Sequence, residues 1–289
     1  MPLNRLHNPG APIELHLSGL RLVAFSISGV ASYLLVPAFD ACFDLGHCPL
    51  EAIKLRHVFL SHVHQDHSGG VHRHLSLRRM FGSRPSRVYA PAESASRLDD
   101  YLRAFQRLEE KPEDEVEGVV RGLEPGDEVR LSGRYRVRAF DVCHRIASRG
   151  YTVVESRRKL KPEFEGAPGE AIAAARARGE EVHDVSEVAA LTYVGDSTLD
   201  TLLRNPEVGQ SEVLFLEATH LPGTSPEVSE RWGHTHLGEL AELAEQRPEI
   251  FASRHIVLKH FSTRYERNEI LAARRLFGED LRARLTFLV

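Results

Sequence analysis

The chain has 289 residues, of which 42% are hydrophobic and 27% are charged, and its formal net charge is −4. This composition is typical of a globular protein, and the mildly acidic balance excludes a surface that is basic throughout, as in many nucleic-acid binders. No run of about 18 apolar residues could span a membrane, and residues 1–12 contain no apolar segment of a signal peptide. The cysteines Cys42, Cys48 and Cys143 form no CxxC pair, which favours a reducing, cytoplasmic location over a disulfide framework.

Short apolar strands alternate with helical segments along the chain, without repeats or low-complexity linkers. The pattern predicts one domain of mixed α/β (α+β) class, with helices outside a sheet system and functional residues at strand ends. In chain order, strands are expected within 15–29, 31–46, 57–62, 86–91, 127–142, 150–156, 190–197, 212–220, 255–261 and 283–289, and helices after residue 70 and at 93–110, 236–246 and 268–278.

The segment SHVHQDHSGG, residues 61–70, crowds four side chains that can bind metals: His62, His64, Asp66 and His67. Buried imidazoles all need hydrogen-bond partners, so core packing is a poor explanation, and the bland alternative is a solvated histidine-rich loop. His62 and His64 are two residues apart, so in extended chain both point the same way. A turn at Asp66 and His67 would aim these at a second ion. Imidazole and carboxylate ligands without thiolate suit zinc, or else manganese or iron, and the glycines that follow would allow a tight turn.

Two ions need more than four ligands, and three further candidates stand at strand ends. His144 follows RVRAFDV, Asp196 ends ALTYVGD, and His260 ends HIVLKH. Each of these three residues, taken alone, would be interpreted as a structural residue or a cap. Asp196 has two oxygens to share and is placed between the ions, which would leave an open position for a water whose pKa the ions lower. We assign one ion to His62, His64 and His144, and the other to Asp66, His67 and His260.

These motifs resemble the metallo-β-lactamase superfamily over nearly the whole chain, through HVFLSHVHQDHSGG, His144, GDS and HF. The resemblance implies an αββα sandwich that carries a dinuclear site. Asp44, in FDLG, matches an aspartate that supports the histidine loop in that superfamily without binding metal. The superfamily hydrolyses lactams, lactones, thioesters and phosphodiesters, so the motif alone does not name a substrate.

Glu217 in LEATH and His234 in RWGHTH offer a carboxylate–imidazole pair outside the metal set. A histidine held by a carboxylate has a raised pKa and a fixed orientation, so it can donate a proton to a leaving alkoxide. Phosphodiester cleavage needs such a donor, because the sugar oxygen is a poor leaving group. The alternative is a carboxylate that caps a strand end and a histidine in a surface loop.

The order and spacing of CHRIASRGY, GDS, EAT, GHTH and KHFSTRY are similar to those of the ribonuclease Z family, and closest to its short form. The resemblance implies an endonuclease that removes 3′ trailers from precursor tRNA, with Asp66 as ligand and general base, and Glu217 and His234 as the proton-donating pair. The family histidine matches His234 and not the nearby His236. His220 stands where the family usually has phenylalanine, so a share in the role stays open for it. The family also implies a homodimer, in which one subunit's arm can hold the tRNA that the other cuts.

The insert within this resemblance, residues 155–188, corresponds to the family's tRNA-binding arm, or exosite. It contains a predicted short helix at 171–179 and eight acidic residues, so its net charge is not positive, and a solvated charged hairpin is the alternative. A basic cluster there would bind phosphates without sequence preference. The glycine- and proline-rich tip of longer bacterial arms is not evident. The candidate RNA-binding residues are Arg157, Arg158, Lys159 and Lys161 in the arm and, near the metals, Arg264, whose alternative is a surface salt bridge.

Two other classes of function compete with this reading. A small-molecule phosphodiesterase, or a lactone or thioester hydrolase of the same fold, would not need the arm. A non-catalytic RNA-binding or metal-sensing protein would have no need for seven ligands. A redox diiron protein of this fold would normally carry glutamate in place of His64, and the interval from Asp196 to His260 is too short for the inserted domain of β-CASP nucleases.

Overall fold

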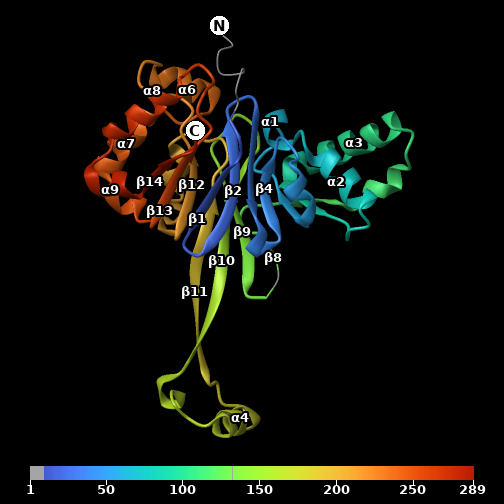
Figure 1. The fold of residues 1–289 in the computed structure, drawn as a ribbon, viewed down its shortest axis with the longest axis vertical. Helices are drawn as coiled ribbons and strands as arrows, with labels where there is room; N and C mark the ends of the chain where they lie inside the picture. Colours follow the sequence, from blue (N-terminus) through green and yellow to red (C-terminus); the bar gives the residue numbers. More distant parts are fainter. Residues whose placement is uncertain (1–9, 132) are drawn as a thin grey trace.

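Two seven-stranded sheets lie face to face at the centre of the computed structural model (Figure 1). The structure describes residues 10–131 and 133–289. The prediction that residues 1–12 contain no signal peptide therefore falls mostly outside the described residues. The first sheet has the order β1 (Ile13–Leu17), β2 (Leu20–Ile27), β3 (Ala31–Val36), β4 (Ala41–Leu45), β5 (His57–Phe59), β6 (Arg87–Pro91) and β7 (Val120–Leu123). The second has the order β14 (Leu285–Phe287), β13 (His255–Lys259), β12 (Val213–Glu217), β11 (His183–Tyr193), β10 (Arg149–Leu160), β9 (Tyr135–Asp141) and β8 (Glu128–Arg130).

Each sheet is antiparallel in one half and parallel in the other. Strands β1 to β4 pair antiparallel and β4 to β7 parallel, while β8 to β11 pair antiparallel and β11 to β14 parallel. The parallel strands are connected by segments that contain helices, which cover the outer faces. This arrangement confirms the predicted mixed α/β class.

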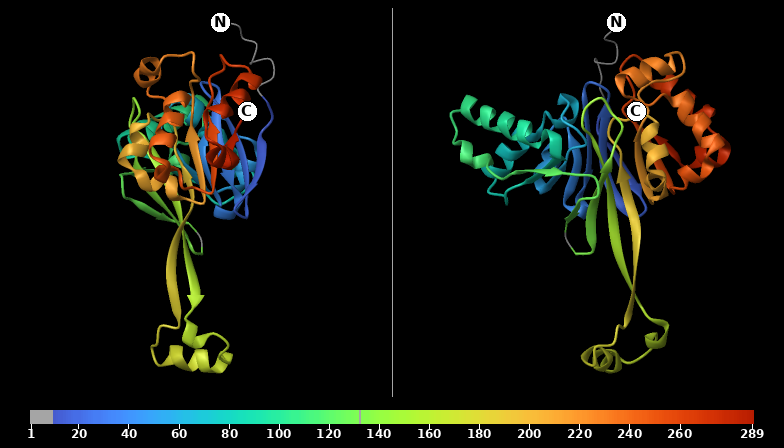
Figure 2. Two further views of the ribbon diagram at one scale, coloured as in Figure 1. Left: turned by 90° about the vertical axis from the view of Figure 1, so that its left-hand side faces the viewer. Right: turned by 180° about the vertical axis from the view of Figure 1, so that it is seen from behind.

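The helices form the two outer layers (Figures 1 and 2). On the first sheet lie α1 (Gln65–Ser68), α2 (Val71–Met80) and α3 (Ala92–Leu108), and on the second α5 (Asp200–Arg204), α6 (Pro226–Trp232), α7 (Leu237–Gln246), α8 (Arg267–Ala272) and α9 (Glu279–Arg284). Short 3₁₀ helices include η4 (Glu113–Val116) and η8 (Ala273–Leu276). Among the described residues, no helix combines the length and the apolar character that crossing a bilayer demands.

Three apolar clusters hold the layers together. The central one lies between the sheets, where Phe43 stacks on Phe59 and Tyr193 with ring centroids 5.5 and 5.6 Å apart. A second cluster joins the first sheet to α2 and α3, and a third joins the second sheet to its helices. Helix α3 buries Leu98 and Leu102, which are spaced one turn apart on one face.

The arm is the largest departure from the predicted strands. Strand β10 runs to Leu160 and β11 begins at His183, so both continue beyond the predicted 150–156 and 190–197 into the insert. They form a long antiparallel ribbon that carries α4 (Gly169–Ala177) at its far end, away from the sandwich (Figures 1 and 2). Strand β7 was not expected, and the last strand spans three residues instead of the predicted seven.

The two ends of the sandwich carry different features (Figure 1). Helix α1, within the histidine-rich segment, lies near the upper end, whereas the arm projects from the lower end. Strands β5, β9, β11, β12 and β13 are each followed directly by residues of the histidine-rich segment or its predicted partners. The predicted site therefore forms at the end of the sandwich opposite the arm.

Candidate metal centre

Asp44 holds the histidine-rich segment in place, as the superfamily resemblance implies. Its Oδ1 accepts a hydrogen bond from the backbone N–H of Ser61 at 2.6 Å. Its Oδ2 accepts from Ser61 Oγ at 2.9 Å, from His67 Nδ1 at 2.7 Å and from the Tyr193 hydroxyl at 2.7 Å. Asp44 is completely buried at the end of β4 with φ of 54°, a left-handed conformation that aspartate tolerates better than most residues. The carboxylate thus fixes both ends of the segment on which the ligands stand.

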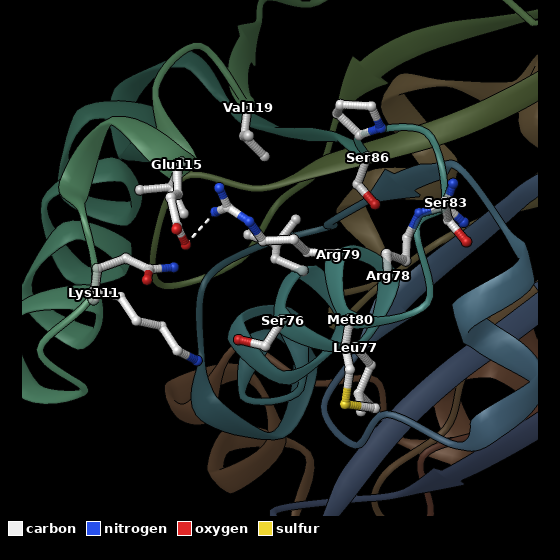
Figure 3. A pocket seen from close by; sticks show the side chains of 14 residues that line it. Ser76, Leu77, Arg78, Arg79, Met80, Ser83, Ser86, Lys111, Glu115 and Val119 are labelled. Atoms are coloured by element: carbon white, nitrogen blue, oxygen red, sulfur yellow. Dashed lines mark ion pairs between the residues drawn. The ribbon is translucent and has the colours of Figure 1, made fainter.

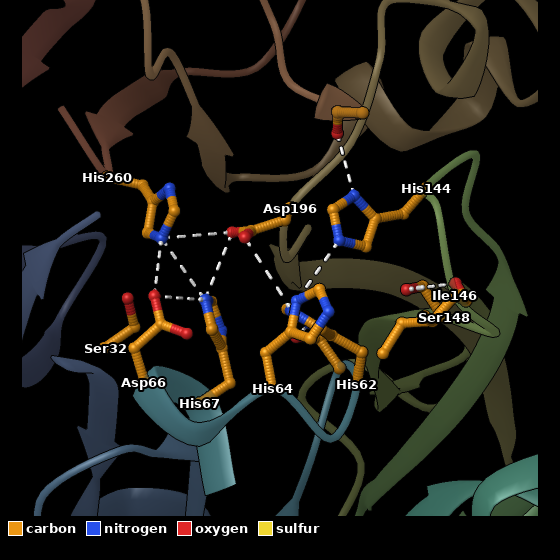
Figure 4. A network of polar contacts seen from close by, with 12 residues as sticks. Ser32, His62, His64, Asp66, His67, His144, Ile146, Ser148, Asp196 and His260 are labelled. Atoms are coloured by element: carbon orange, nitrogen blue, oxygen red, sulfur yellow. Dashed lines mark hydrogen bonds and ion pairs between the residues drawn. The ribbon is translucent and has the colours of Figure 1, made fainter. Parts of the chain in front are cut away.

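The first predicted ligand set comes together in the structure. One ligand atom from each of His62, His64, His144 and Asp196 lies within 4.8 Å of the others (Figure 4). His62 Nε2 is 2.9 Å from His64 Nδ1, and His144 Nε2 is 3.5 Å from the same Nδ1. Three imidazole nitrogens that converge this closely form a typical cradle for a zinc-like cation.

The second predicted set also comes together, and Asp196 faces both groups. Asp66, His67 and His260 offer ligand atoms within 4.8 Å of one another, and the Nε2 atoms of His67 and His260 are 3.3 Å apart (Figure 4). Asp196 Oδ1 lies 3.2 Å from His67 Nε2 and 3.3 Å from His260 Nε2, while its Oδ2 lies 3.8 Å from His62 Nε2. The carboxylate therefore directs one oxygen towards each group.

The second ring nitrogen is already engaged in four of the imidazoles, which leaves their converging nitrogens for a cation. His144 Nδ1 donates to the Gly233 carbonyl at 2.8 Å, and His260 Nδ1 bonds Thr219 Oγ1 at 2.9 Å. His67 Nδ1 donates to Asp44, and His62 Nδ1 lies 3.0 Å from Ser61 Oγ. Such outer partners fix the tautomer and the orientation of metal-binding histidines. Asp196 Oδ1 is buried and accepts no hydrogen bond from the described residues, so the donor set fits two divalent cations.

The carboxylates of the cluster attract positive charge. Burial would raise the pKa of Asp66, but its bond with His260 and the nearby His67 outweigh burial and hold the pKa well below its usual value. Burial alone would lower the pKa of the His67 imidazole, yet Asp196 and Asp44 raise this pKa to about 10. Asp196 and Asp44 therefore stabilise a proton on His67, and the same carboxylates would stabilise a metal cation at this position.

Glu217 and His234 form the predicted pair beside the cluster. His234 Nδ1 lies 2.9 Å from Glu217 Oε1, and Glu217 is completely buried at the end of β12. Burial would lower the pKa of His234, but Glu217 raises it to about 9. Thr219 links the pair to the centre, because its hydroxyl donates to Glu217 at 2.6 Å and accepts from His260 Nδ1. One ligand atom of His234 also lies within 4.8 Å of those of Asp196 and His260, so a ligand role is the geometric alternative.

The other two histidines of this region are engaged elsewhere. His220 is buried and its Nδ1 bonds Ser229 Oγ at 2.9 Å, and burial together with His234 lowers its pKa to about 4. His236 stands at the N-terminus of α7, where its Nδ1 accepts from the Glu239 N–H at 3.3 Å. Neither imidazole contacts Glu217 among the described hydrogen bonds, so the geometry favours His234 as the partner of that carboxylate.

Three glycines around the centre are needed for close packing. A Cβ on Gly46 would lie 1.9 Å from the Asp66 carbonyl, and one on Gly70 would lie 2.7 Å from the Leu45 carbonyl. The chain turns at Gly69 and Gly70 between α1 and α2, as expected, but Gly70 has φ of −87°, so the reason for glycine there is the close approach of two backbones. Gly233 has φ of +73°, and a Cβ there would lie 2.8 Å from His144 Nδ1.

Beside the centre lies a pocket of about 650 Å³ that includes His144 and His234 among its walls. Arg145 and Arg204 line it with cationic groups, and the Arg145 guanidinium lies over the Trp232 ring, 4.9 Å from its centroid. Neither residue was predicted from the sequence. An apolar pocket of about 620 Å³ between α2, α3 and η4 (Figure 3) shares no residue with the cluster.

The predicted RNA-binding residues differ in their surroundings. Arg157 pairs with Glu155 at 2.9 Å and Lys159 with Glu165 at 3.3 Å. Arg158 and Lys161 make no side-chain hydrogen bond or ion pair with any residue that the structure describes. Arg264 is exposed near the cluster, and its Nη1 lies 3.5 Å from Thr224 Oγ1. The structure thus leaves two of the four arm cations without an acidic partner.

Comparison with known proteins shows similarity to one family over most of the chain. A family model described as a beta-lactamase superfamily domain matches residues 38–261. The protein tRNase Z TRZ1 of Arabidopsis thaliana is 30% identical over 259 residues, which cover 89% of this chain and 90% of that protein. The chloroplastic tRNase Z TRZ2 of the same plant is 29% identical over 271 residues, which cover 91% of this chain and 75% of that protein.

Solved structures share the fold at low sequence identity. Human tRNase Z, short form, has a TM-score of 0.53 at 18% identity, with coverage of 96% of this chain and 93% of that chain. The metallo-beta-lactamase fold protein YhfI from Bacillus subtilis has a TM-score of 0.56 at 15% identity and covers 96% of both chains.

Proposed function

The chain belongs to the tRNase Z family of the metallo-β-lactamase superfamily, and on this premise we propose that it is a zinc-dependent endoribonuclease that removes the 3′ trailer from precursor tRNA. The observation that carries the proposal is the Glu217–His234 pair, 2.9 Å apart, directly beside two groups of metal-binding side chains. Hydrolysis of a phosphodiester requires an activated nucleophile and a proton for the leaving sugar oxygen, and the cluster and this pair offer both.

Two divalent cations held by His62, His64 and His144 on one side and Asp66, His67 and His260 on the other, with Asp196 between them, would lower the pKa of a water and stabilise charge on phosphoryl oxygens. Imidazole and carboxylate donors favour zinc, although manganese and iron accept the same set. Metal analysis of the protein purified from its own host would identify the ion.

The chain's own residues would position the nucleophile and move the protons. Asp66 Oδ2 is fixed by the Gly29 N–H at 2.8 Å, which leaves Asp66 Oδ1 to accept a proton from the attacking water. Glu217 holds His234 Nδ1, so Nε2 is the atom that donates a proton to the leaving oxygen. The leaving oxygen is the 3′ oxygen of the last tRNA nucleotide. The expected products are a tRNA with a 3′-hydroxyl and a trailer with a 5′-phosphate.

The arm, residues 155–188, is proposed to hold tRNA, with Arg157, Arg158, Lys159 and Lys161 as phosphate contacts, and Arg264 is proposed as a contact near the metals. The arm and the histidine-rich segment lie at opposite ends of the sandwich (Figure 1), so an arm is badly placed to serve the cluster of its own chain. This separation supports a homodimer in which one subunit's arm holds the tRNA that the other cuts. The expected cytoplasmic location stays a prediction.

A cleavage assay with a trailer-bearing precursor tRNA tests the proposal. The purified protein, loaded with zinc or manganese, should release one trailer with a 5′-phosphate at a single site. A small aryl phosphodiester serves as the competing substrate, because a small-molecule hydrolase would turn it over and leave the RNA intact. An uncut precursor, with active turnover of the small ester, would disprove the tRNA-processing function.

A further inference from the structure

A pocket lined by arginine lies at the base of the arm, on the side of the sandwich away from the metal centre. Its volume is about 530 Å³, and the β8–β9 hairpin and β10 provide its walls. The hairpin points in the same direction as the arm (Figure 1). The lining residues are Arg130, Gly133, Arg134, Tyr135, Arg136, Ser156 and Arg158, so four of the seven residues carry a guanidinium group.

The strand register places cations opposite one another. Arg130 of β8 pairs across the ladder with Arg136 of β9. Like charges at directly opposed positions destabilise a sheet. Glu128 and Glu187 offset the charge of Arg136, and an anion bound beside Arg130 would offset the other charge. The backbone bond from Ser156 N to the Arg134 carbonyl, 2.9 Å long, fixes β10 against the same hairpin.

Acidic side chains neutralise only part of this positive charge. Of the six arginines in and around the pocket, four share three glutamates: Arg134 and Arg157 pair with Glu155, Arg136 and Arg138 with Glu128, and Arg136 also with Glu187. The other two, Arg130 and Arg158, have no acidic partner among the described residues. Both side chains are exposed, so they are free to meet an incoming anion.

One of the arginines is held in position by the core. The Arg134 guanidinium lies over the Tyr135 ring, 5.4 Å from its centroid, and its Nη2 donates to the Tyr135 hydroxyl at 3.3 Å. Tyr135 in turn packs on Phe39 of the central cluster, with ring centroids 4.8 Å apart. A guanidinium anchored in this way loses less conformational freedom when it binds a phosphate.

We propose that this arginine pocket is a phosphate-binding site that receives the sugar-phosphate backbone of the RNA held by the arm. The inference rests on the proposed function, since it takes RNA as the substrate. Guanidinium forks match phosphate oxygens in pairs. The pocket lies on the arm's side of the sandwich, so it would position RNA without touching the reacting atoms.

The variant Arg130→Ala/Arg134→Ala tests the inference, because it removes two exposed cations of the pocket that lie outside the arm. Binding is measured with mature tRNA, which carries no trailer to cut, over a range of salt concentrations. We expect the affinity to fall about tenfold at low salt, and the slope of log K against log salt to decrease by about 1 to 2. Hydrolysis of a small aryl phosphodiester should be unchanged.

The control variant Arg97→Ala/Arg275→Ala removes the same charge from exposed positions on α3 and η8. Equal tRNA binding by the two double variants would overturn the inference. Titration with inorganic phosphate distinguishes the source of the ligand: saturable binding that Arg130→Ala/Arg134→Ala abolishes, with tRNA binding unchanged, would assign the pocket to a free anion and also overturn it. Failure of the wild-type protein to cut precursor tRNA would instead disprove the proposed function.

Discussion

The metal centre and the arm of this protein use charged side chains in opposite ways. In the centre, His62 and His67 are completely buried, and the second nitrogen of each ring has its own partner. In the arm, the Lys159 side chain is 81% exposed and its contact with Glu165 is a surface ion pair. The centre depends on the position of each atom, whereas the arm is proposed to act through individual exposed cations.

The difference predicts how each region responds to change. A buried ligand cannot be replaced by water, so its loss leaves other buried polar groups without a partner. An exposed cation acts through a field that salt screens over about 8 to 10 Å, and its neighbours can compensate for its loss. Substitutions in the centre should therefore be severe and insensitive to salt, and those in the arm mild and sensitive to salt.

The largest effect is expected from Asp196→Asn. The substitution preserves the shape of the residue but removes the charge that faces both ligand groups. We expect a loss of bound metal and a decrease in the cleavage rate of about a thousandfold or more, because several kcal/mol of charge stabilisation disappear. Elemental analysis and the precursor assay measure the two quantities.

Asp280→Asn on α9 is the matched control and should retain both metal and activity. Prolonged dialysis of the wild-type protein against a chelator should reproduce the loss, and added zinc should reverse it. Full activity of Asp196→Asn would remove the basis for a shared carboxylate between the two groups.

The second effect concerns the proton donor. His234→Ala should retain both metal ions but decrease the cleavage rate by about 10² to 10⁴, the usual contribution of a general acid. The geometry also allows His234 to act as a ligand, together with Asp196 and His260. Metal content decides between the two roles, since loss of one ion would assign His234 to the ligands.

His220→Phe complements this experiment. It places at position 220 the residue that the ribonuclease Z family usually has, and His220 contacts Ser229 and not Glu217. We expect the variant to cleave within a few-fold of the wild-type rate. A loss as large as that of His234→Ala would instead give His220 a share in proton transfer.

The ligand set could be proposed from the sequence because strand ends are visible in it. The motif at 61–70 follows an apolar strand of the first sheet, and His144, Asp196 and His260 follow strands of the second, so two facing sheets that end at the same side bring them together. The partners of the ligands could not be found in this way. Thr219 and Gly233 bond His260 and His144 from segments distant in sequence, and a threonine or a glycine carries no pattern that indicates such a role.

The arm was predicted less completely for a physical reason. The sequence indicated where the arm begins and ends, but its two strands continue several residues beyond the apolar runs. In this part of the strands both faces carry polar residues, so the alternation of apolar and polar residues that indicates a strand is lost. The arginines at positions 134, 136 and 138 do show that period. Their spacing on one strand was the available signal for the basic surface at the base of the arm.

The next prediction compares the pKa of a histidine in the centre with that of a buried histidine elsewhere in the protein. His74 is buried like His67, but no carboxylate accompanies it; its Nε2 bonds Ser86 Oγ at 2.9 Å, and burial and Arg78 lower its pKa to about 3. The unfolded chain binds a proton at this histidine below about pH 6.5, and the folded chain does not until about pH 3. Stability is therefore complete above pH 6.5 and decreases as the pH falls towards 3.

His74→Gln should remove this dependence. In metal-free protein, the free energy of unfolding of the wild type relative to His74→Gln should decrease by about 2 kcal/mol between pH 7 and pH 5. Urea denaturation at the two pH values gives the comparison. A constant difference would mean that His74 is protonated in the folded chain, contrary to its burial.

The smallest effect is expected within the arm, where two lysines provide a matched pair. Lys159 pairs with Glu165 at 3.3 Å, whereas Lys161, two residues further on, has no acidic partner in the described part of the chain. Glu165 weakens the attraction of Lys159 for a phosphate, so Lys161→Ala should weaken tRNA binding by a factor of about three to five, as expected for one exposed ionic contact, and Lys159→Ala by less. Both effects should vanish at high salt, because exposed charges are screened. Equal losses that persist at high salt would show that these lysines act through shape and packing. The expected difference in salt sensitivity between the centre and the arm would then be wrong for the arm.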